Sequence, residues 1–217
     1  SETTEGVHIH IIDAELMGKG EKEKKDLYIE GIQNNGIINH YEYIINSEGT
    51  IEIRHVLKPE GKMPLWFPRI GLTLTVSDAL DQVKWYGRGP QENYPDRKTG
   101  YPTGIYASTV QAMYEPYLMP QDYGLRTDVR WLQLTTDKGI GLQFKMNEWF
   151  NFNIYPYSTD NLTKAMYTYQ LQKQKGMTLN LDYATTGVGC TARGVFGAYK
   201  AMPQEYRRTI SIRPMMK

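Results

Sequence analysis

Residues 70–76 read Ile-Gly-Leu-Thr-Leu-Thr-Val, and they form the clearest strand signal in the chain. Apolar side chains recur at every second position, which is the period of a β-strand with one buried and one polar face. The same alternation returns at residues 7–11, 41–45, 51–53, 140–146, 150–154, 177–183 and 210–212. We therefore expect at least eight strands, arranged as antiparallel sheets with two unlike faces.

The segments between these runs favour an all-β fold. Ser47-Glu48-Gly49-Thr50 separates two alternating runs, which is typical of a β-hairpin with a glycine in its loop. One helical stretch is expected, over residues 160–166, with Ser158 or Thr159 as its cap. Strands do not alternate with long helical patterns, which argues against a doubly wound sheet or a TIM barrel. The sequence predicts an all-β antiparallel sandwich with one short helix at most.

Composition excludes several classes of function. The 217 residues include 25 Lys and Arg and 24 Asp and Glu, a net charge of +1, which disfavours nucleic acid as a partner. No apolar run approaches the ~20 residues that span a membrane. The single cysteine, Cys190, excludes an internal disulfide framework and a multi-cysteine zinc site, and it fits cytoplasm and periplasm equally. The 17 tyrosines suit half-buried sheet faces and polar, ring-shaped ligands such as carbohydrate.

The segment richest in functional groups is Tyr86-Gly-Arg-Gly-Pro-Gln-Glu-Asn-Tyr-Pro-Asp-Arg97. Its glycines and prolines exclude a regular strand or helix, and a third glycine at the dinucleotide-loop spacing is lacking. Its arginines and carboxylates either bind their own surroundings through forked hydrogen bonds or face a polar ligand. We interpret it as a structural loop carried by Arg88, Glu92, Asn93, Tyr94, Asp96 and Arg97.

This segment resembles the signature of the C-terminal small-chain domain of family 2 β-galactosidases. Two further runs are similar to that family: residues 114–131, which begin Tyr-Glu-Pro-Tyr, and Leu179-Asn-Leu-Asp-Tyr183, which leads to Gly187-Val-Gly189. The resemblance implies a galactose-mutarotase-like super-sandwich. It also implies that residues 1–217 form a single small-chain domain that lacks its N-terminal strands.

In the intact enzymes of this family, the small-chain domain follows a (β/α)₈ barrel that carries two catalytic glutamates and the metal sites. The resemblance therefore implies no catalytic residue, no metal site and no cofactor in this chain, with Mg²⁺ and Na⁺ belonging to the parent enzyme. The implied role is an accessory domain that completes a carbohydrate-binding cleft and supports assembly. Its partners would be carbohydrate, the upstream domains and further copies in a homo-oligomer. A stand-alone carbohydrate-binding module remains the alternative.

The sequence departs from the family after Gly187-Val-Gly189. Relatives continue Gly-Asp-Asp-Ser-Trp, and that tryptophan stacks in the active site, whereas this chain continues Cys-Thr-Ala-Arg-Gly. Arg193 or Gly194 takes the tryptophan's place, and an arginine can donate forked hydrogen bonds to sugar hydroxyls or a carboxylate. The predicted carbohydrate-binding residues are Cys190, Thr191, Arg193 and Gly194. Lactose, another β-linked sugar and an acidic glycan all remain open as substrates.

Other signals have simpler interpretations. His8 and His10 share a strand face, but no third metal ligand lies nearby, so we interpret them as an exposed face. Trp149, Phe150 and Phe152 alternate with asparagines in a pattern that would also suit a sugar platform. The period places Phe150 and Phe152 on one buried face, so core packing is favoured.

Overall fold

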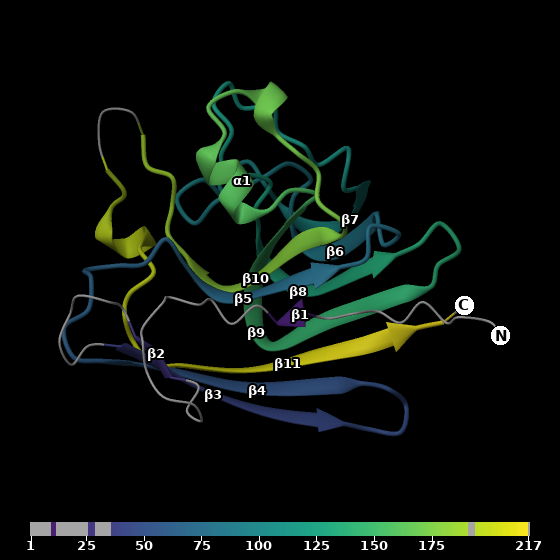
Figure 1. Cartoon of the computed structure of the whole chain (residues 1–217), viewed down its shortest axis with the longest axis horizontal. Coiled ribbons are helices and arrows are strands. Elements are labelled where there is room, and N and C mark those ends of the chain that lie inside the picture. Colours follow the sequence, from purple (N-terminus) through teal and green to yellow (C-terminus); the bar gives the residue numbers. More distant parts are fainter. Residues whose placement is uncertain (1–9, 12–25, 29–35, 191–193, 217) are drawn as a thin grey trace.

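The computed structural model describes residues 10–11, 26–28, 36–190 and 194–216, and within them the fold is mostly antiparallel β-sheet (Figure 1). The strands are β1 (His10–Ile11), β2 (Asp26–Tyr28), β3 (Gly36–Ile45), β4 (Ile51–Glu60), β5 (Arg69–Val76), β6 (Gln82–Arg88), β7 (Thr103–Thr109), β8 (Arg126–Thr135), β9 (Gly141–Tyr155), β10 (Met177–Thr185) and β11 (Tyr206–Met215). The all-β prediction is confirmed. The predicted strand at residues 7–11 and the pair His8 and His10 lie partly outside the described residues.

The strands hydrogen-bond in the order β1-β5-β10-β9-β11-β4-β3-β2, and β8, β6 and β7 continue from the other edge of β9. β9 pairs with β11 through residues 141–146 and with β10 through residues 151–155. The long strand β9 therefore belongs to two layers. In Figure 1, β11, β4 and β3 form the lower layer, and β5 and β10 lie above it.

Two expected strands, at residues 140–146 and 150–154, are one continuous strand in the structure. Residues 147–149 between the two runs, Asn-Glu-Trp, include no glycine or proline, so the chain stays extended there. The irregularity appears in the pairing of β9 with β8. Its pairing jumps from Val129 opposite Phe150 to Trp131 opposite Lys145, so β9 carries extra residues opposite Arg130. The guanidinium of Arg130 lies 4.2 Å from the ring of Trp149 at this bulge.

The core lies between the two layers and is built from the alternating residues that the sequence marked. In β5, every second side chain is buried, and Phe150 and Phe152 are both fully buried, as predicted. The largest fully buried side chains are Trp85, Phe144, Phe150, Phe152, Ile53, Leu74, Leu132, Leu134 and Ile154, together with Met113, Leu125 and Tyr155. Each such side chain contributes about 1.5–3 kcal/mol through its removal from water.

The predicted hairpin and helix are both present. β3 and β4 pair in register across the turn, with Ile45 opposite Ile51. The helix α1 (Thr159–Lys164) begins where Ser158 accepts a hydrogen bond from the backbone of Asn161 at 3.0 Å. It ends two residues earlier than expected. Two 3₁₀ turns, η1 (Thr168–Gln170) and η2 (Gly197–Tyr199), had no clear sequence signal.

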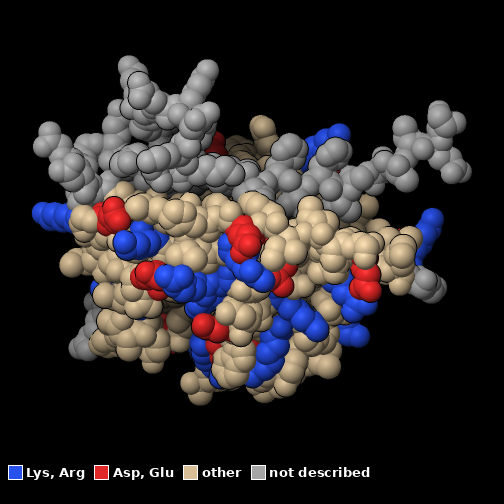
Figure 2. All heavy atoms as spheres, turned by 90° about the horizontal axis from the view of Figure 1, so that it is seen from below, with Lys and Arg blue, Asp and Glu red and all other residues tan. Residues whose placement is uncertain are grey.

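Charged side chains of both signs meet on the surface. On the face seen in Figure 2, Lys and Arg side chains gather with Asp and Glu among them. Arg54 pairs with both Glu42 and Glu52, and Arg208 pairs with Glu148. Exposed pairs such as those of Arg54 contribute little to stability, because water and salt screen them.

Candidate functional site

The loop after β6 folds around the buried carboxylate of Glu92. That carboxylate accepts hydrogen bonds from Arg97 Nη2 at 2.7 Å, from the backbone of Gly124 at 2.8 Å and from the Tyr94 hydroxyl at 3.1 Å. The hydroxyl of Tyr117 is a fourth donor. Burial raises the pKa of Glu92, but these hydrogen bonds outweigh it and hold the pKa below its usual value. Glu92 is therefore an ionised hub of the loop at neutral pH.

The prediction that residues 86–97 contain no regular strand is wrong at their start, because Tyr86–Arg88 pair with β7 and end strand β6. Arg88 at the end of β6 and Asn93 in the loop attach this region to β8. The side-chain oxygen of Asn93 accepts from the backbone of Thr127 at 3.0 Å and from the Thr127 hydroxyl at 2.5 Å. Arg88 Nε lies 2.5 Å from the carboxylate of Asp128, and Lys98 Nζ lies 2.6 Å from the other oxygen. The loop therefore satisfies its own charges through its surroundings, as a structural loop does.

Asp96 binds a second loop, the one that follows β10. Its two carboxylate oxygens accept from the backbone of Val188 at 3.0 Å and of Gly189 at 2.7 Å. A Cβ atom on Gly187 would lie within 2.3–2.5 Å of the same carboxyl group, so any other residue there would displace the carboxylate or the loop. The structure thus brings together two segments that the sequence singled out separately.

The predicted carbohydrate-binding residues begin directly after this contact. Cys190 and Gly194 are exposed. Thr191 and Arg193 lie outside the described residues, and their role stays a prediction. Within the described ranges, no group of three or more His, Cys, Asp or Glu side chains could hold a metal ion. Nor does any helix of those ranges have the length and apolar character needed to cross a membrane.

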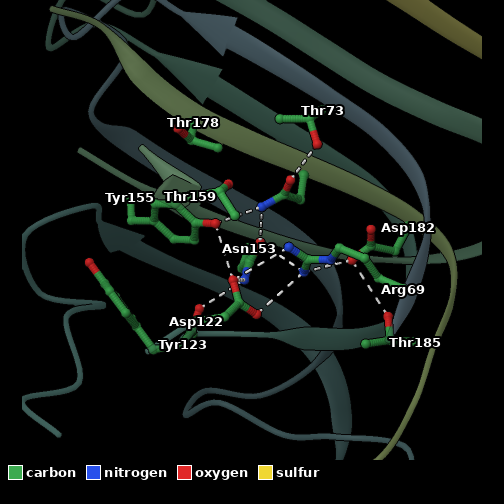
Figure 3. Close-up of polar contacts among 12 residues, drawn as sticks. Arg69, Thr73, Asp122, Tyr123, Asn153, Tyr155, Thr159, Thr178, Asp182 and Thr185 are labelled. Atoms are coloured by element: carbon green, nitrogen blue, oxygen red, sulfur yellow. Dashed lines mark hydrogen bonds and ion pairs between the residues drawn. The ribbon is translucent and has the colours of Figure 1, made fainter. Parts of the chain in front are cut away.

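A second polar cluster, which we call the Arg69 network, had no assigned role in the sequence (Figure 3). Arg69 Nη2 lies 3.0 Å from the buried carboxylate of Asp182, and Arg69 Nη1 lies 3.4 Å from the exposed carboxylate of Asp122. The amide of Asn153 donates to Asp122 at 2.9 Å. Burial raises the pKa of Asp182 to about 6, despite the attraction of Arg69. Arg69 keeps its charge because its attraction to Asp182 and Asp122 outweighs burial.

The Arg69 network reaches toward the loop after β10. Thr185 donates weakly to Asp182 at 3.5 Å and accepts from the amide of Asn151 at 3.1 Å. Asn151 in turn accepts from the backbone of Asp128 at 3.3 Å. Polar residues alternating with Leu179 and Leu181 in β10, on a strand buried on both faces, were the signal that could have revealed this network.

Exposed apolar side chains lie in the segment between β10 and β11 and in the segment before β5, and we call them the apolar rim. Phe67 donates its backbone N–H to Ala201 at 2.9 Å, and Gly187 donates to Tyr199 at 2.8 Å, which holds three chain segments side by side. The rim consists of Leu65, Trp66, Val188, Phe196, Tyr199 and Met202.

Comparison with known proteins places this architecture in a family. The family model described as "Beta galactosidase small chain" matches residues 6–212. A β-galactosidase of Priestia megaterium is 38% identical over 147 residues, which are 68% of this chain and 14% of the relative. A β-galactosidase of Vibrio cholerae is 39% identical over 122 residues, which are 56% of this chain and 11% of the relative. A β-galactosidase of Pseudoalteromonas haloplanktis is 33% identical over 159 residues, which are 71% of this chain and 14% of the relative.

The matched part of the chain thus spans only 11–14% of each of these curated relatives. The family match nevertheless covers nearly all of this chain and agrees with the motifs in the loop after β6 and in β10. The chain belongs to the β-galactosidase small-chain family.

Proposed function

We propose that this chain is an accessory domain of a β-galactosidase-like glycoside hydrolase, in which it completes a carbohydrate-binding cleft and supports assembly. The catalytic glutamates would lie upstream in the same polypeptide. Family membership supports this proposal, as does the small share of each relative that the chain covers. The wall of the cleft would be the loop after β10, beginning at Asp96's contact with Val188 and Gly189.

The apolar rim is the observation that carries this proposal. Clustered exposed apolar side chains on a soluble protein mark a surface that another structure covers. The rim borders the loop after β10, and Leu65 is 85% exposed and Phe196 65% exposed. We infer that the upstream part of the polypeptide covers this rim. A stand-alone carbohydrate-binding module would leave it in water.

The proposed sugar contacts are Cys190, Thr191, Arg193 and Gly194, with Arg193 as the main polar group. A guanidinium offers five N–H donors, and it can fork onto two sugar hydroxyls or onto a carboxylate. This proposal rests on the position of Arg193 in the sequence, four residues beyond the Gly189 that Asp96 holds.

The decisive experiment uses the complete polypeptide encoded by the reading frame that contains this chain. We expect it to hydrolyse an aryl β-galactoside, and we expect deletion of residues 1–217 to abolish turnover. Adding the chain in trans should restore part of the activity, since the rim can dock again. Undiminished kcat/KM after the deletion would contradict the accessory role. Sugar binding by the isolated chain, measured by calorimetry, would favour the alternative module.

The sugar contact is tested by Arg193→Ala in the same polypeptide. Loss of two hydrogen bonds that involve a charged group should raise KM about tenfold or more. Lys138→Ala is the matched control, because Lys138 lies on an exposed turn remote in sequence from the loop. Equal KM values for the Arg193 and Lys138 variants would remove Arg193 from the cleft.

A further inference from the structure

We propose that Asp96 is a positioning residue, whose carboxylate fixes the loop after β10 by filling a pocket of backbone N–H groups. The contact itself is independent of any ligand, while its consequence for sugar binding rests on the function proposed above. Residues 92–97 and 187–189, which form this contact, all belong to the described part of the chain.

The N–H groups of Val188 and Gly189 are consecutive, and each donates to a different oxygen of Asp96, at 3.0 and 2.7 Å. Gly189 has a φ of +67°, in the left-handed region that favours glycine. Consecutive N–H groups beside a left-handed residue form a nest, which is a binding site for an anion. Here the anion is a side chain of the same protein, and hydrogen bonds of this charged type are the strong ones.

Gly187, which has no side chain, leaves space for the Asp96 carboxylate beside the loop. The Cβ of any other residue at Gly187 would lie 2.3 Å from Asp96 Cγ. Atoms at that distance overlap, so either the carboxylate or the loop would have to move. The glycines at positions 187 and 189 thus serve the same contact, one by space and one by backbone conformation.

Asp96 is also held on its own side. The backbone of Arg97 donates to the carbonyl of Tyr94 at 2.8 Å, which closes a tight turn with Asp96 inside it. Arg97 lies 2.7 Å from Glu92 and 5.1 Å from the ring centroid of Tyr94. Among the described residues, the hydrogen-bond donors to the Asp96 carboxylate are the N–H groups of this nest. Glu92 therefore holds the turn of residues 94–97 in place through Arg97, and Asp96 in that turn fixes the position of the loop after β10.

The first measurement is amide hydrogen exchange of Val188 and Gly189 in the 217-residue chain by NMR. In Asp96→Ala both amides should exchange about tenfold faster or more, because each loses a charge-assisted acceptor. Asp96→Asn keeps one acceptor oxygen, so it should protect one amide and release the other. Asp160→Ala is the control, because Asp160 is exposed and pairs with exposed Lys164 on the helix α1. Unchanged exchange in both Asp96 variants would overturn the inference.

The second measurement separates this inference from the proposed function. In the complete polypeptide, Asp96→Ala should raise KM severalfold while kcat stays within about twofold, because a displaced binding loop weakens substrate affinity but not chemistry. Faster exchange with unchanged KM would leave Asp96 as a positioning residue and contradict the cleft role of the loop. A midpoint temperature like that of Asp160→Ala shows that the fold is intact. If Asp96→Ala does not fold, Asp96→Asn and Gly187→Ala supply the same comparison.

Discussion

The hydroxyl of Tyr183 lies 2.7 Å from Nδ1 of His55, and this hydrogen bond joins β10 in one layer to β4 in the other. The other ring nitrogen of His55 lies 2.9 Å from the side-chain oxygen of Asn39, and the ring stacks on Tyr41 with centroids 4.2 Å apart. His55 is therefore a buried link between the two layers.

Burial lowers the pKa of His55 to about 4, so the folded protein holds it neutral. The unfolded chain binds its proton near pH 6.5, so the contribution of His55 to stability is lost as pH falls from about 6.5 to about 4. The loss amounts to about 3 kcal/mol. NMR titration of the imidazole protons should give a midpoint near 4. A midpoint at or above 6 would contradict the buried hydrogen-bonded ring.

The contribution of Asp182 to stability should change with pH in the direction opposite to that of His55. Burial raises its pKa to about 6, so the folded protein binds its proton more tightly than the unfolded chain does. Its stabilising contribution is present below about pH 4 and is lost as pH rises through about 6. Urea unfolding of the unmodified chain and of Asp182→Asn should therefore show a larger cost of the substitution at pH 4.5 than at pH 7.5. Equal costs at the two pH values would exclude a raised pKa.

Removing Arg69 should leave Asp182 as a buried charge without its cation. Arg69→Met is expected to destabilise the protein by about 3–5 kcal/mol at pH 7.5, with a smaller loss at pH 5, where Asp182 is protonated. The double variant Arg69→Met with Asp182→Leu should recover part of this stability, because no uncompensated charge remains. Additive losses in the double variant would show that the pair is not coupled.

Glu92→Gln should disrupt the loop after β6. The amide group would face donors instead of acceptors, and an unsatisfied buried donor costs about 1–3 kcal/mol. Glu48→Gln is the control, since Glu48 lies in an exposed turn. Chemical unfolding of both variants measures the difference. A loss no larger than that of Glu48→Gln would mean that Glu92 is not the hub of the loop.

Gly71→Ala tests the register shift between β5 and β10 at Asp182. The added Cβ would lie 2.3 Å from the carbonyl oxygen of Leu181 and 2.6 Å from Asp182 Cα, and backbone atoms cannot rotate away. We expect a loss of about 2–4 kcal/mol. Gly100→Ala has open space and should be near neutral. Similar midpoint temperatures for the two variants would contradict this packing.

Local patterns predicted most of the strands because burial of one sheet face imposes a period of two on the sequence. β5 follows this rule throughout, and the hairpin at Gly49 follows from turn chemistry. The same rule failed within β9, because a bulge opposite Arg130 changes pairing without leaving a break in the sequence. The sequence singled out the loop after β6 because its residue types are unusual. It did not predict that the donors of this loop converge on Glu92.

Periodicity and short motifs are thus enough to establish an all-β chain and its likeness to the small-chain family. Only the tertiary structure decided which polar groups contact one another. Asp96 and Gly189 are 93 positions apart, Arg69 and Asp182 are 113 apart, and His55 and Tyr183 are 128 apart. The reason is physical: these contacts form only after the sheets pair, and no local preference of either residue encodes a partner so distant along the chain.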